Sequence, residues 1–397
     1  MSPDDRQSQR TRAARAGLSW DEQHSSVVPP LYLSTTFRFS GFGQPPRYEY
    51  SRTSNPTRNL VAETLAELES GAGGEITASG MAAATTVLHA FATQGSVVAI
   101  PVDAYGGTWR LFNAMAERGM IELVLADFAD PASLTSLWER RPSLVWLETP
   151  SNPLLRITDI AAVAEAAHAA GAVVAVDNTF LSPALQRPIE QGADVVVHST
   201  TKYLNGHSDV VGGVVVGATD ELVTTLRWWA NCLGTPGSPF DAYQTLRGVR
   251  TLGVRMRAHN DNAQALAELL AQHPAVRAVH YPGLSDHPGH DLARRQQDGF
   301  GGMLSFELAD LAAVKQCLES LTCFTIAESL GGVESLVCHP ATMTHAAMPP
   351  VVQQAAGITE GLLRISVGIE DTDDLLRDLR AGLDAAEGRA PHSAARN

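Results

Sequence analysis

Residues 172–202, AVVAVDNTFLSPALQRPIEQGADVVVHSTTK, decide the fold, because they contain two apolar runs separated by a helix-like segment. Both runs are apolar at successive positions and do not alternate with polar residues, which is typical of strands buried on both faces. Charged side chains follow each run, Asp177 after the first and Lys202 after the second. The stretch predicts two strands of a buried parallel sheet with polar groups at their carboxyl ends.

The same pattern recurs on both sides of this stretch. Further apolar runs begin at Ser96, Ile121, Ser143 and Val210, and helix-like segments such as DIAAVAEAAHAAG (residues 159–171) separate the first five runs of the series. Parallel strands that alternate with helices predict a doubly wound α/β domain. Its ligand should lie at the carboxyl ends of the strands, where loops meet helix N-termini.

Two other regions flank this domain, as a chain of 397 residues allows. In residues 256–397, amphipathic helical patterns alternate with the strand candidates MLSFEL and LLRISVG, which predicts a smaller α+β domain. Residues 1–58 have little helical periodicity and are either a disordered leader or an extended arm that reaches a neighbouring subunit. Their aromatic residues favour the arm, because disordered segments contain few. The large domain is then residues 59–255.

Composition excludes several classes of function. The net charge of −14 argues against nucleic-acid binding, which depends on clustered Lys and Arg. The four cysteines show no CxxC spacing, so a metal site built from them is not expected. The first twenty residues have no apolar core, and no apolar run is long enough to span a bilayer. We therefore expect a cytoplasmic protein with no metal, membrane or nucleic-acid partner.

Asp177 and Lys202 together indicate the chemistry. An ionised carboxylate at the end of a buried strand is unfavourable without a positive partner, and alone it would be interpreted as a helix N-cap or half of an ion pair. A desolvated lysine has a lowered pKa and can form a Schiff base with a carbonyl. Pyridoxal 5'-phosphate (PLP) needs both a lysine for its aldehyde and an acid for its ring nitrogen. The pair therefore predicts a PLP site.

Other residues fit the phosphate of such a cofactor. In EITASGMAAATTVLHAF a short strand passes into a helix at Gly80 and Met81, and backbone N–H groups at a helix start bind anions. Ser199 and Thr201 are two residues apart, so on an extended chain their hydroxyls face the same side. A dinucleotide-binding turn is excluded here because GxGxxG is absent.

Two side chains are candidates for the ring face and the substrate. Tyr105 begins a Gly-Gly loop and either stacks on a planar ring or anchors the turn. Arg364 is a guanidinium within the apolar run LLRISVG, so it needs either the α-carboxylate of an amino acid or an internal carboxylate. His198 and His207 lack metal-ligand spacing such as HxxxH, and we interpret both as structural.

From about residue 26 to residue 382 the sequence resembles the Cys/Met-metabolism family of PLP-dependent enzymes. The motifs that carry the resemblance are YSRTSNPTR, SGMAA, AYGGTWRLF, ETPSNPLLR, VDNTFLSPALQ, HSTTKYLNGHSDVVGG, AESLGGVESL and LLRISVGIED. The resemblance implies PLP fold type I, the aspartate-aminotransferase-like α/β fold. It also implies a homotetramer, built as a dimer of dimers, whose active sites are shared across subunits.

The resemblance implies a role for each site residue. Lys202 would hold the cofactor, Asp177 would pair with its ring nitrogen, and Ser329 would orient Lys202. Tyr105 would stack on the ring and, if its pKa is depressed, act as a further acid or base. The implied phosphate ligands are Gly80, Met81, Ser199 and Thr201, with Tyr50 and Arg52 of the neighbouring subunit.

The implied reaction is a γ-replacement in methionine biosynthesis, in which cysteine displaces the acyl group of O-succinyl- or O-acetyl-L-homoserine to give L-cystathionine. The alternatives are γ-cleavage of cystathionine and use of sulfide in place of cysteine. Arg364 and Asn152 would hold the α-carboxylate, while Glu328 and Arg110 match positions associated with cystathionine-type substrates. Thr53 stands where the bacterial γ-synthase pattern has an arginine suited to a succinyl carboxylate, which leaves the acyl donor, and synthesis versus cleavage, open.

Overall fold

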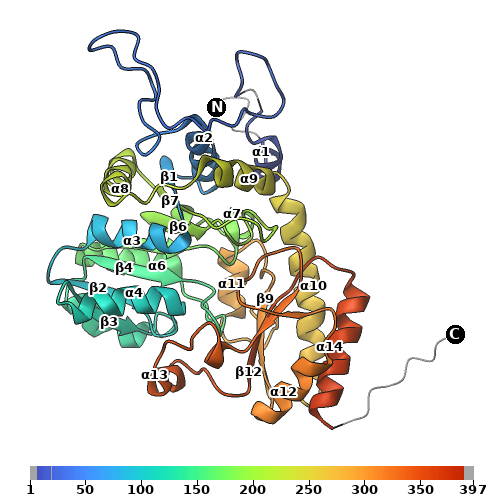
Figure 1. Cartoon of the computed structure of the whole chain (residues 1–397). Helices are drawn as coiled ribbons and strands as arrows, with labels where there is room; N and C mark the ends of the chain where they lie inside the picture. The colour runs from blue at the N-terminus through green and yellow to red at the C-terminus, as the bar shows by residue number, and fades with distance from the viewer. Residues whose placement is uncertain (1–6, 19, 389–397) are drawn as a thin grey trace.

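The first sheet contains seven strands in the order β1-β7-β6-β5-β4-β2-β3 (Figure 1). The computed structural model describes residues 7–18 and 20–388. Neighbouring strands pair in parallel except at β7, which is antiparallel to both β1 and β6, so the predicted mainly parallel sheet is confirmed. The strands are β1 (Gly73–Thr77), β2 (Ser96–Pro101), β3 (Ile121–Ala126), β4 (Leu144–Glu148), β5 (Val173–Asp177), β6 (Val195–Ser199) and β7 (Gly213–Gly217).

Helices cover both faces of this sheet, because its central strands are apolar at successive positions. On one face, Leu144 and Trp146 of β4 share a buried cluster with residues of α3, α4 and α8. On the other face, Val145 and Leu147 cluster with residues of α5 and α6. The helices of this half are α1 (Gln9–Arg15), α2 (Pro56–Leu68), α3 (Gly80–Phe91), α4 (Gly106–Glu117), η2 (Pro131–Leu134), α5 (Thr135–Glu139), α6 (Ile160–Ala170), α7 (Ser182–Leu185), η3 (Pro188–Gln191), α8 (Asp220–Leu233) and α9 (Pro239–Val249).

The second sheet has five strands in the order β10-β11-β12-β9-β8, antiparallel except for the pair β10 and β11. Its strands are β8 (Ala278–His280), β9 (Met303–Glu307), β10 (Thr325–Ile326), β11 (Leu336–Cys338) and β12 (Leu362–Ser366). The helices around it are α10 (Leu252–Gln272), α11 (His290–Gln296), α12 (Leu311–Ser320), η4 (Pro340–Thr342), α13 (Pro350–Ala355) and α14 (Thr372–Ala386). This half has the predicted α+β architecture. No helix among the described residues is both long and apolar enough to cross a membrane.

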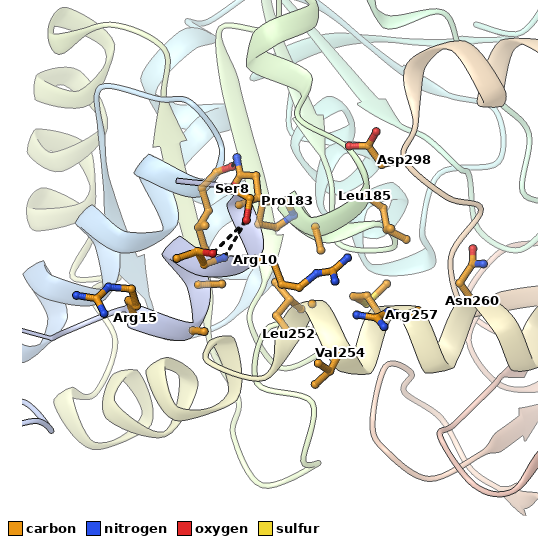
Figure 2. A pocket seen from close by; sticks show the side chains of 18 residues that line it. Ser8, Arg10, Arg15, Pro183, Leu185, Leu252, Val254, Arg257, Asn260 and Asp298 are labelled. Carbon is orange, nitrogen blue, oxygen red and sulfur yellow. Dashed lines mark hydrogen bonds between the residues drawn. The ribbon is translucent and has the colours of Figure 1, made fainter. Parts of the chain in front are cut away.

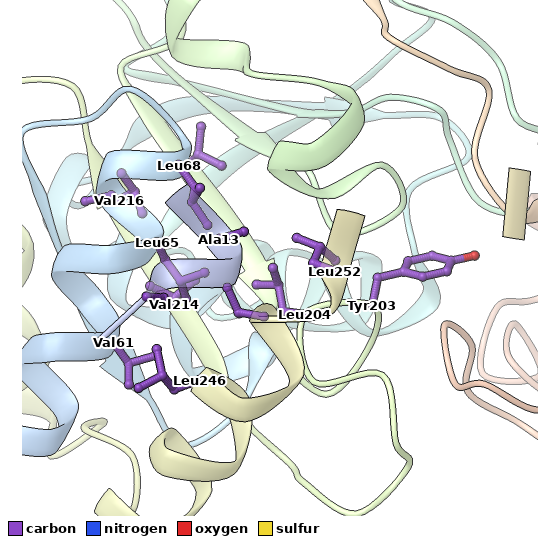
Figure 3. Packing of buried hydrophobic residues seen from close by; sticks show 14 of the residues in the cluster. Ala13, Val61, Leu65, Leu68, Tyr203, Leu204, Val214, Val216, Leu246 and Leu252 are labelled. Carbon is purple, nitrogen blue, oxygen red and sulfur yellow. The ribbon is translucent and has the colours of Figure 1, made fainter. Parts of the chain in front are cut away.

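The long helix α10 joins the two halves. Leu252 and Met256 near its start pack in the core formed with α1, α2 and α9, part of which Figure 3 shows around Leu65 and Val214. Residues such as Leu266, further along the helix, pack in the core of the second sheet. The predicted division between residues 255 and 256 falls within this helix, and it stays a prediction.

The N-terminal region runs largely outside both cores. The first helix, α1, packs through Ala13 and Ala16, whereas residues 20–55 contain no helix and only isolated β-bridges. Figure 1 shows this blue segment as loops that project away from the rest of the chain. Several apolar side chains on it are exposed, including Leu33 and Phe42. The segment is extended, and its role as an arm that reaches a neighbouring subunit stays a prediction.

Candidate active site

A cavity of about 460 Å³ lies at the carboxyl ends of β4, β5 and β6, next to the starts of α3 and α4. Residues from the second half of the chain close its other side. Three predicted site residues, Tyr50, Arg52 and Thr53, do not line it. The predicted residues that do are Gly80, Met81, Tyr105, Arg110, Asn152, Asp177, Ser199, Thr201, Lys202, Glu328, Ser329 and Arg364.

A larger cavity of about 940 Å³ lies elsewhere, between α1, α7 and α10 (Figure 2). Its lining includes Arg10, Arg15 and Arg257, whose side chains are exposed, and apolar residues such as Leu185 and Val254. None of the predicted site residues lines it. Size therefore does not identify the active site, whereas the grouping of lysine, carboxylates and arginine in the smaller cavity does.

Lys202 follows β6 and extends into the smaller cavity. Its Nζ donates a hydrogen bond to Ser329 Oγ at 2.7 Å. Burial lowers the pKa of Lys202 to about 8, and the nearby charge of Arg364 adds to this effect. Ser329 has a φ of +91°, which is unfavourable for a residue with a side chain by about 1–3 kcal/mol and is common at functional sites. The pair thus presents an amine that is partly neutral near physiological pH.

The carboxyl ends of β4 and β5 form the floor of the cavity. Glu148 and Asp177 are register partners, and the pleat directs both side chains to the cavity face of the sheet. Asp177 Oδ1 accepts a hydrogen bond from the backbone N–H of Thr179 at 2.9 Å. Burial raises the pKa of Asp177. A cationic ring nitrogen would relieve this unfavourable burial.

Gly80 begins α3 at the edge of the cavity, and a Cβ on it would lie 2.8 Å from the Cβ of Ser199. Only glycine therefore fits between the helix start and β6, and the free N–H groups of the first turn are left facing the cavity. Thr201 Oγ1 accepts a hydrogen bond from the N–H of Gly212 at 3.0 Å. This arrangement of helix start and hydroxyls suits a phosphate group.

Tyr105 precedes α4, and its backbone N–H donates to Glu148 Oε2 at 2.7 Å. The ring lies over Gly107, where a Cβ would come within 2.5 Å of Tyr105 Cε1. Burial raises the pKa of Tyr105, although Arg110 acts in the opposite direction. The depressed pKa required for the predicted acid or base role is therefore absent in the cofactor-free chain, and that role stays a prediction.

Arg364 lies in β12 with 2% of its surface exposed. Its Nη1 donates to Asn152 Oδ1 at 2.9 Å and its Nη2 to the carbonyl oxygen of Ser329 at 3.0 Å. Its buried Nε has no hydrogen-bond partner in the part of the chain that the structure describes. Among the described residues, neither Arg364 nor Asp177 takes part in an ion pair. The alternative of an internal carboxylate partner is thus not realised, and the positive charge of the guanidinium is available for a substrate carboxylate.

Two exposed residues of opposite charge, Glu328 and Arg110, lie at the mouth of the cavity. Tyr50 and Arg52 lie away from it, since Arg52 Nη1 donates to Asn231 Oδ1 of α8 at 2.7 Å. Within one chain these two arm residues do not reach the site.

The two histidines have structural partners. His198 is buried, and its Nε2 lies 2.6 Å from Glu69 Oε1. His207 Nδ1 lies 2.7 Å from the carbonyl oxygen of Asn205. Neither histidine lines the cavity, which is consistent with their interpretation as structural.

Sequence reasoning did not single out Glu148, which lines the cavity, or His345, which does not line it but contacts Asn152, which does. Glu148 could have been found, because it ends an apolar run just as Asp177 does. His345 could not have been found in this way, because it lies in an irregular segment between η4 and α13. Its sequence neighbours Met343 and Thr344 line the cavity.

The cavity fits the cofactor that the resemblance implies. Its lining residues match the groups of PLP. Lys202, an amine with a lowered pKa, suits the aldehyde, and Asp177, a buried carboxyl group that a cation would stabilise, suits the ring nitrogen. The helix start at Gly80 suits the phosphate. Among the described residues, Arg364 Nε has no hydrogen-bond partner, so it could bind a carboxylate of the substrate.

Comparisons with known proteins agree with this fit. The family model described as "Cys/Met metabolism PLP-dependent enzyme" matches residues 10–384. Cystathionine gamma-synthase of Escherichia coli (strain K12) is 52% identical over 379 residues, which cover 95% of this chain and 98% of that protein. Cystathionine gamma-lyase of Bacillus subtilis (strain 168) is 45% identical over 375 residues, which cover 94% and 99%, and proteins named cystathionine beta-lyase match at similar identity.

A solved structure is similar over nearly the whole chain. The cystathionine gamma synthase of Xanthomonas oryzae pv. oryzae, in complex with cystathionine, superposes with a TM-score of 0.95 at 57% sequence identity. The match covers 97% of this chain and 100% of that one.

Proposed function

The chain belongs to the Cys/Met-metabolism family of PLP-dependent enzymes, and from this premise we propose that it catalyses γ-replacement on an O-acyl-L-homoserine. The sulfur of L-cysteine would replace the acyloxy group at the γ-carbon, giving L-cystathionine and succinate or acetate, as in methionine biosynthesis. Its cofactor is PLP, and the predicted PLP fold type I is confirmed by the structural similarity. The high identity to proteins named γ-synthases supports this reaction over cleavage.

The observation that carries the proposal is the buried Arg364, which lacks a carboxylate partner, beside the hydrogen-bonded pair of Lys202 and Ser329. Arg364 would bind the α-carboxylate of the amino-acid substrate, with its plane set by Asn152. This places the α-carbon of the substrate next to the amine that must move its proton. An α-amino acid is therefore the class of substrate that the cavity best accommodates.

PLP, when bound, withdraws electrons from the α-carbon of the substrate, so that protons can leave the α- and β-carbons. Lys202 Nζ would take and return these protons, and its lowered pKa favours both directions near neutral pH. Asp177 would keep a proton on the ring nitrogen. The start of α3 at Gly80 and Met81, with Ser199 and Thr201, would bind the phosphate.

The residues at the mouth of the cavity would recognise the second substrate, cysteine. Glu328 and Arg110 carry opposite charges, as recognition of the ammonium and carboxylate groups of cysteine requires. Thr53 has no positive charge that could bind the carboxylate of a succinyl group. We therefore propose O-acetyl-L-homoserine as an acyl donor as well as the succinyl ester. A second candidate, γ-cleavage of cystathionine, is favoured by the 45% identity to the Bacillus subtilis γ-lyase.

We also propose that two chains share each active site, as part of a homotetramer. The arm projects from its own chain and exposes Leu33 and Phe42, which a partner surface would cover (Figure 1). Tyr50 and Arg52 lie away from their own cavity and would reach the phosphate of the neighbouring site. Docking of the arm would bury the apolar side chains and complete the cofactor site in one step.

The reaction is tested with the purified holoenzyme. O-succinyl- and O-acetyl-L-homoserine are each supplied with and without cysteine, L-cystathionine is supplied alone in a separate assay, and cystathionine, 2-oxobutyrate and free acyl acid are quantified. Cystathionine formation that depends on cysteine supports γ-replacement. Release of 2-oxobutyrate from cystathionine, with no synthesis from either ester, would establish the cleavage reaction instead.

A further inference from the structure

A continuous chain of hydrogen-bonded residues runs along one wall of the active-site cavity. It starts at Lys202, which donates to Ser329 Oγ, and continues from the Ser329 carbonyl oxygen to Arg364 Nη2. Arg364 Nη1 then donates to the side-chain oxygen of Asn152, and the backbone carbonyl oxygen of Asn152 lies 3.2 Å from His345 Nε2. His345 is therefore connected, through Asn152, Arg364 and Ser329, to the amine of Lys202.

The contacts of His345 define its tautomer. A backbone carbonyl oxygen can only accept, so Nε2 must carry the hydrogen that it shares with Asn152. Nδ1 then accepts from the hydroxyl of Thr344 at 2.9 Å. The ring is fully buried, and burial, together with the nearby charge of Arg364, lowers the pKa of His345 to about 4. The imidazole is thus neutral and in one tautomer at physiological pH.

The segment around His345 forms part of the cavity wall and contacts both neighbouring loops. Its residues Met343, Thr344 and Ala347 line the cavity. Gly106 of the tyrosine loop packs directly on it, since a Cβ there would lie 2.5 Å from the carbonyl oxygen of Thr344. The Asn152 loop, in contrast, is tied to the segment through the His345 ring. Leu154 of the same loop also shares a buried cluster with Met348 of the segment. The His345 hydrogen bond adds a directional contact at Asn152 itself, the residue that contacts Arg364.

We propose that His345 is a positioning residue for the substrate carboxylate. By donating to the backbone carbonyl oxygen of Asn152, it fixes the position of that residue. The side-chain amide of Asn152 in turn orients Arg364, so His345 controls how well the guanidinium binds the carboxylate of an α-amino acid. The inference rests on the carboxylate site described under the proposed function. His345 does not touch the substrate, and it acts through Asn152 and Arg364 only.

Two substitutions of His345 distinguish the roles of its two ring nitrogens. In His345→Gln the side-chain amide nitrogen reaches the position of Nε2, so the bond to Asn152 can be kept. In His345→Asn the shorter amide reaches only the position of Nδ1, so that bond is lost. The matched control is His339→Asn. His339 is also buried, with Nδ1 2.9 Å from Thr342 Oγ1, but its Nε2 lies 3.1 Å from the Glu360 carbonyl oxygen and not next to Asn152.

Binding is measured on the holoenzyme with glycine and methylamine, which differ only by the carboxylate, through the change in cofactor absorbance. His345→Asn should weaken glycine binding about 5- to 10-fold, the effect expected for one lost hydrogen bond, and leave methylamine binding unchanged. His345→Gln should restore glycine binding to within about twofold of wild type. His339→Asn should leave the ratio of glycine to methylamine affinity unchanged, even if it lowers the melting temperature.

Equal losses for glycine and methylamine, or an unchanged ratio in His345→Asn, would overturn the inference. A wild-type enzyme that shows no preference for glycine over methylamine would overturn the carboxylate site and this role together. An enzyme that prefers glycine but makes no cystathionine would instead refute the γ-replacement and leave the role of His345 intact.

Discussion

Glu148 and Asp177 face the same cavity from adjacent parallel strands, as register partners at the ends of β4 and β5. Burial raises the pKa of both groups, and Asp177 helps to raise that of Glu148 to about 8. The cofactor-free pair therefore retains a proton that both groups would lose in water near neutral pH. A cation beside Asp177 would allow that proton to leave.

This pair should make the stability of the cofactor-free protein depend on pH. Between about pH 5 and about pH 8 the unfolded chain has lost the Glu148 proton while the folded chain still holds it, so the free energy of unfolding should fall as the pH rises. Glu148→Gln cannot ionise and should make this dependence shallower. Urea unfolding of both proteins across this range measures the effect, and parallel curves would contradict it.

The uptake of PLP should report the pKa of Lys202. Only the neutral amine attacks an aldehyde, so the rate should rise about tenfold per pH unit below about pH 8 and level off above it. Arg364→Met should move the midpoint upward, because the charge of Arg364 helps to lower the pKa of Lys202. Stopped-flow absorbance of the cofactor-free protein measures the rate. An unmoved midpoint in Arg364→Met would mean that burial alone lowers the pKa.

If Arg364 binds the substrate carboxylate as proposed, replacing its guanidinium should affect substrate binding most strongly. Arg364→Lys keeps a charge but loses the two-pronged geometry and the bonds to Asn152 and Ser329, so KM for the amino-acid substrate should rise about 10- to 100-fold with a smaller change in kcat. Arg156→Lys is the control, because Arg156 pairs with Asp127 outside the cavity. Similar KM values in both variants would refute the carboxylate site.

The glycine at the start of α3 should be needed for PLP binding. In Gly80→Ala the added Cβ meets Ser199, so the helix start must move, which destabilises the protein by about 1–3 kcal/mol. Affinity for PLP should fall as well, since the same N–H groups are proposed to hold the phosphate. Titration of cofactor-free protein with PLP and its melting temperature separate the two effects. Full affinity in a destabilised variant would place the phosphate elsewhere.

Shared active sites should allow two inactive chains to complement each other. Lys202→Ala lacks the reacting amine and Arg52→Ala lacks the arm residue, but a mixed pair has one site with both groups intact. Random reassembly makes half of the pairs mixed, so activity should return to about a quarter of the wild-type value. Refolding the two variants together and assaying the mixture tests this. A mixture as inactive as each variant alone would refute the exchange of arms.

Local patterns were sufficient for most of the fold. Continuous apolar runs predicted six strands of the first sheet, because a strand buried on both faces is apolar at nearly every position. They did not reveal β8, β10 and β11, which are two or three residues long and too short to show a period. They form because neighbouring strands pair with them: β9 with β8, β12 with β11, and β11 in turn with β10.

Some features of the candidate site could likewise be predicted from local sequence patterns, and others could not. Lys202 and Asp177 could be predicted because each is a charge at the end of an apolar run. The resemblance added residues such as Asn152, but no local pattern indicated what Arg364 would contact. That depended on a residue 212 positions away in the chain.

The sequence by itself determined the mainly parallel sheet with helices on both faces and the family, and it predicted the cofactor roles of Lys202 and Asp177. These properties depend on patterns of neighbouring residues. Only the tertiary structure decided that Glu148 holds the Tyr105 backbone and that His345 is bound to the Asn152 loop. The physical reason is that a hydrogen bond between distant segments depends on how the two halves pack. Local periodicity carries no record of that packing.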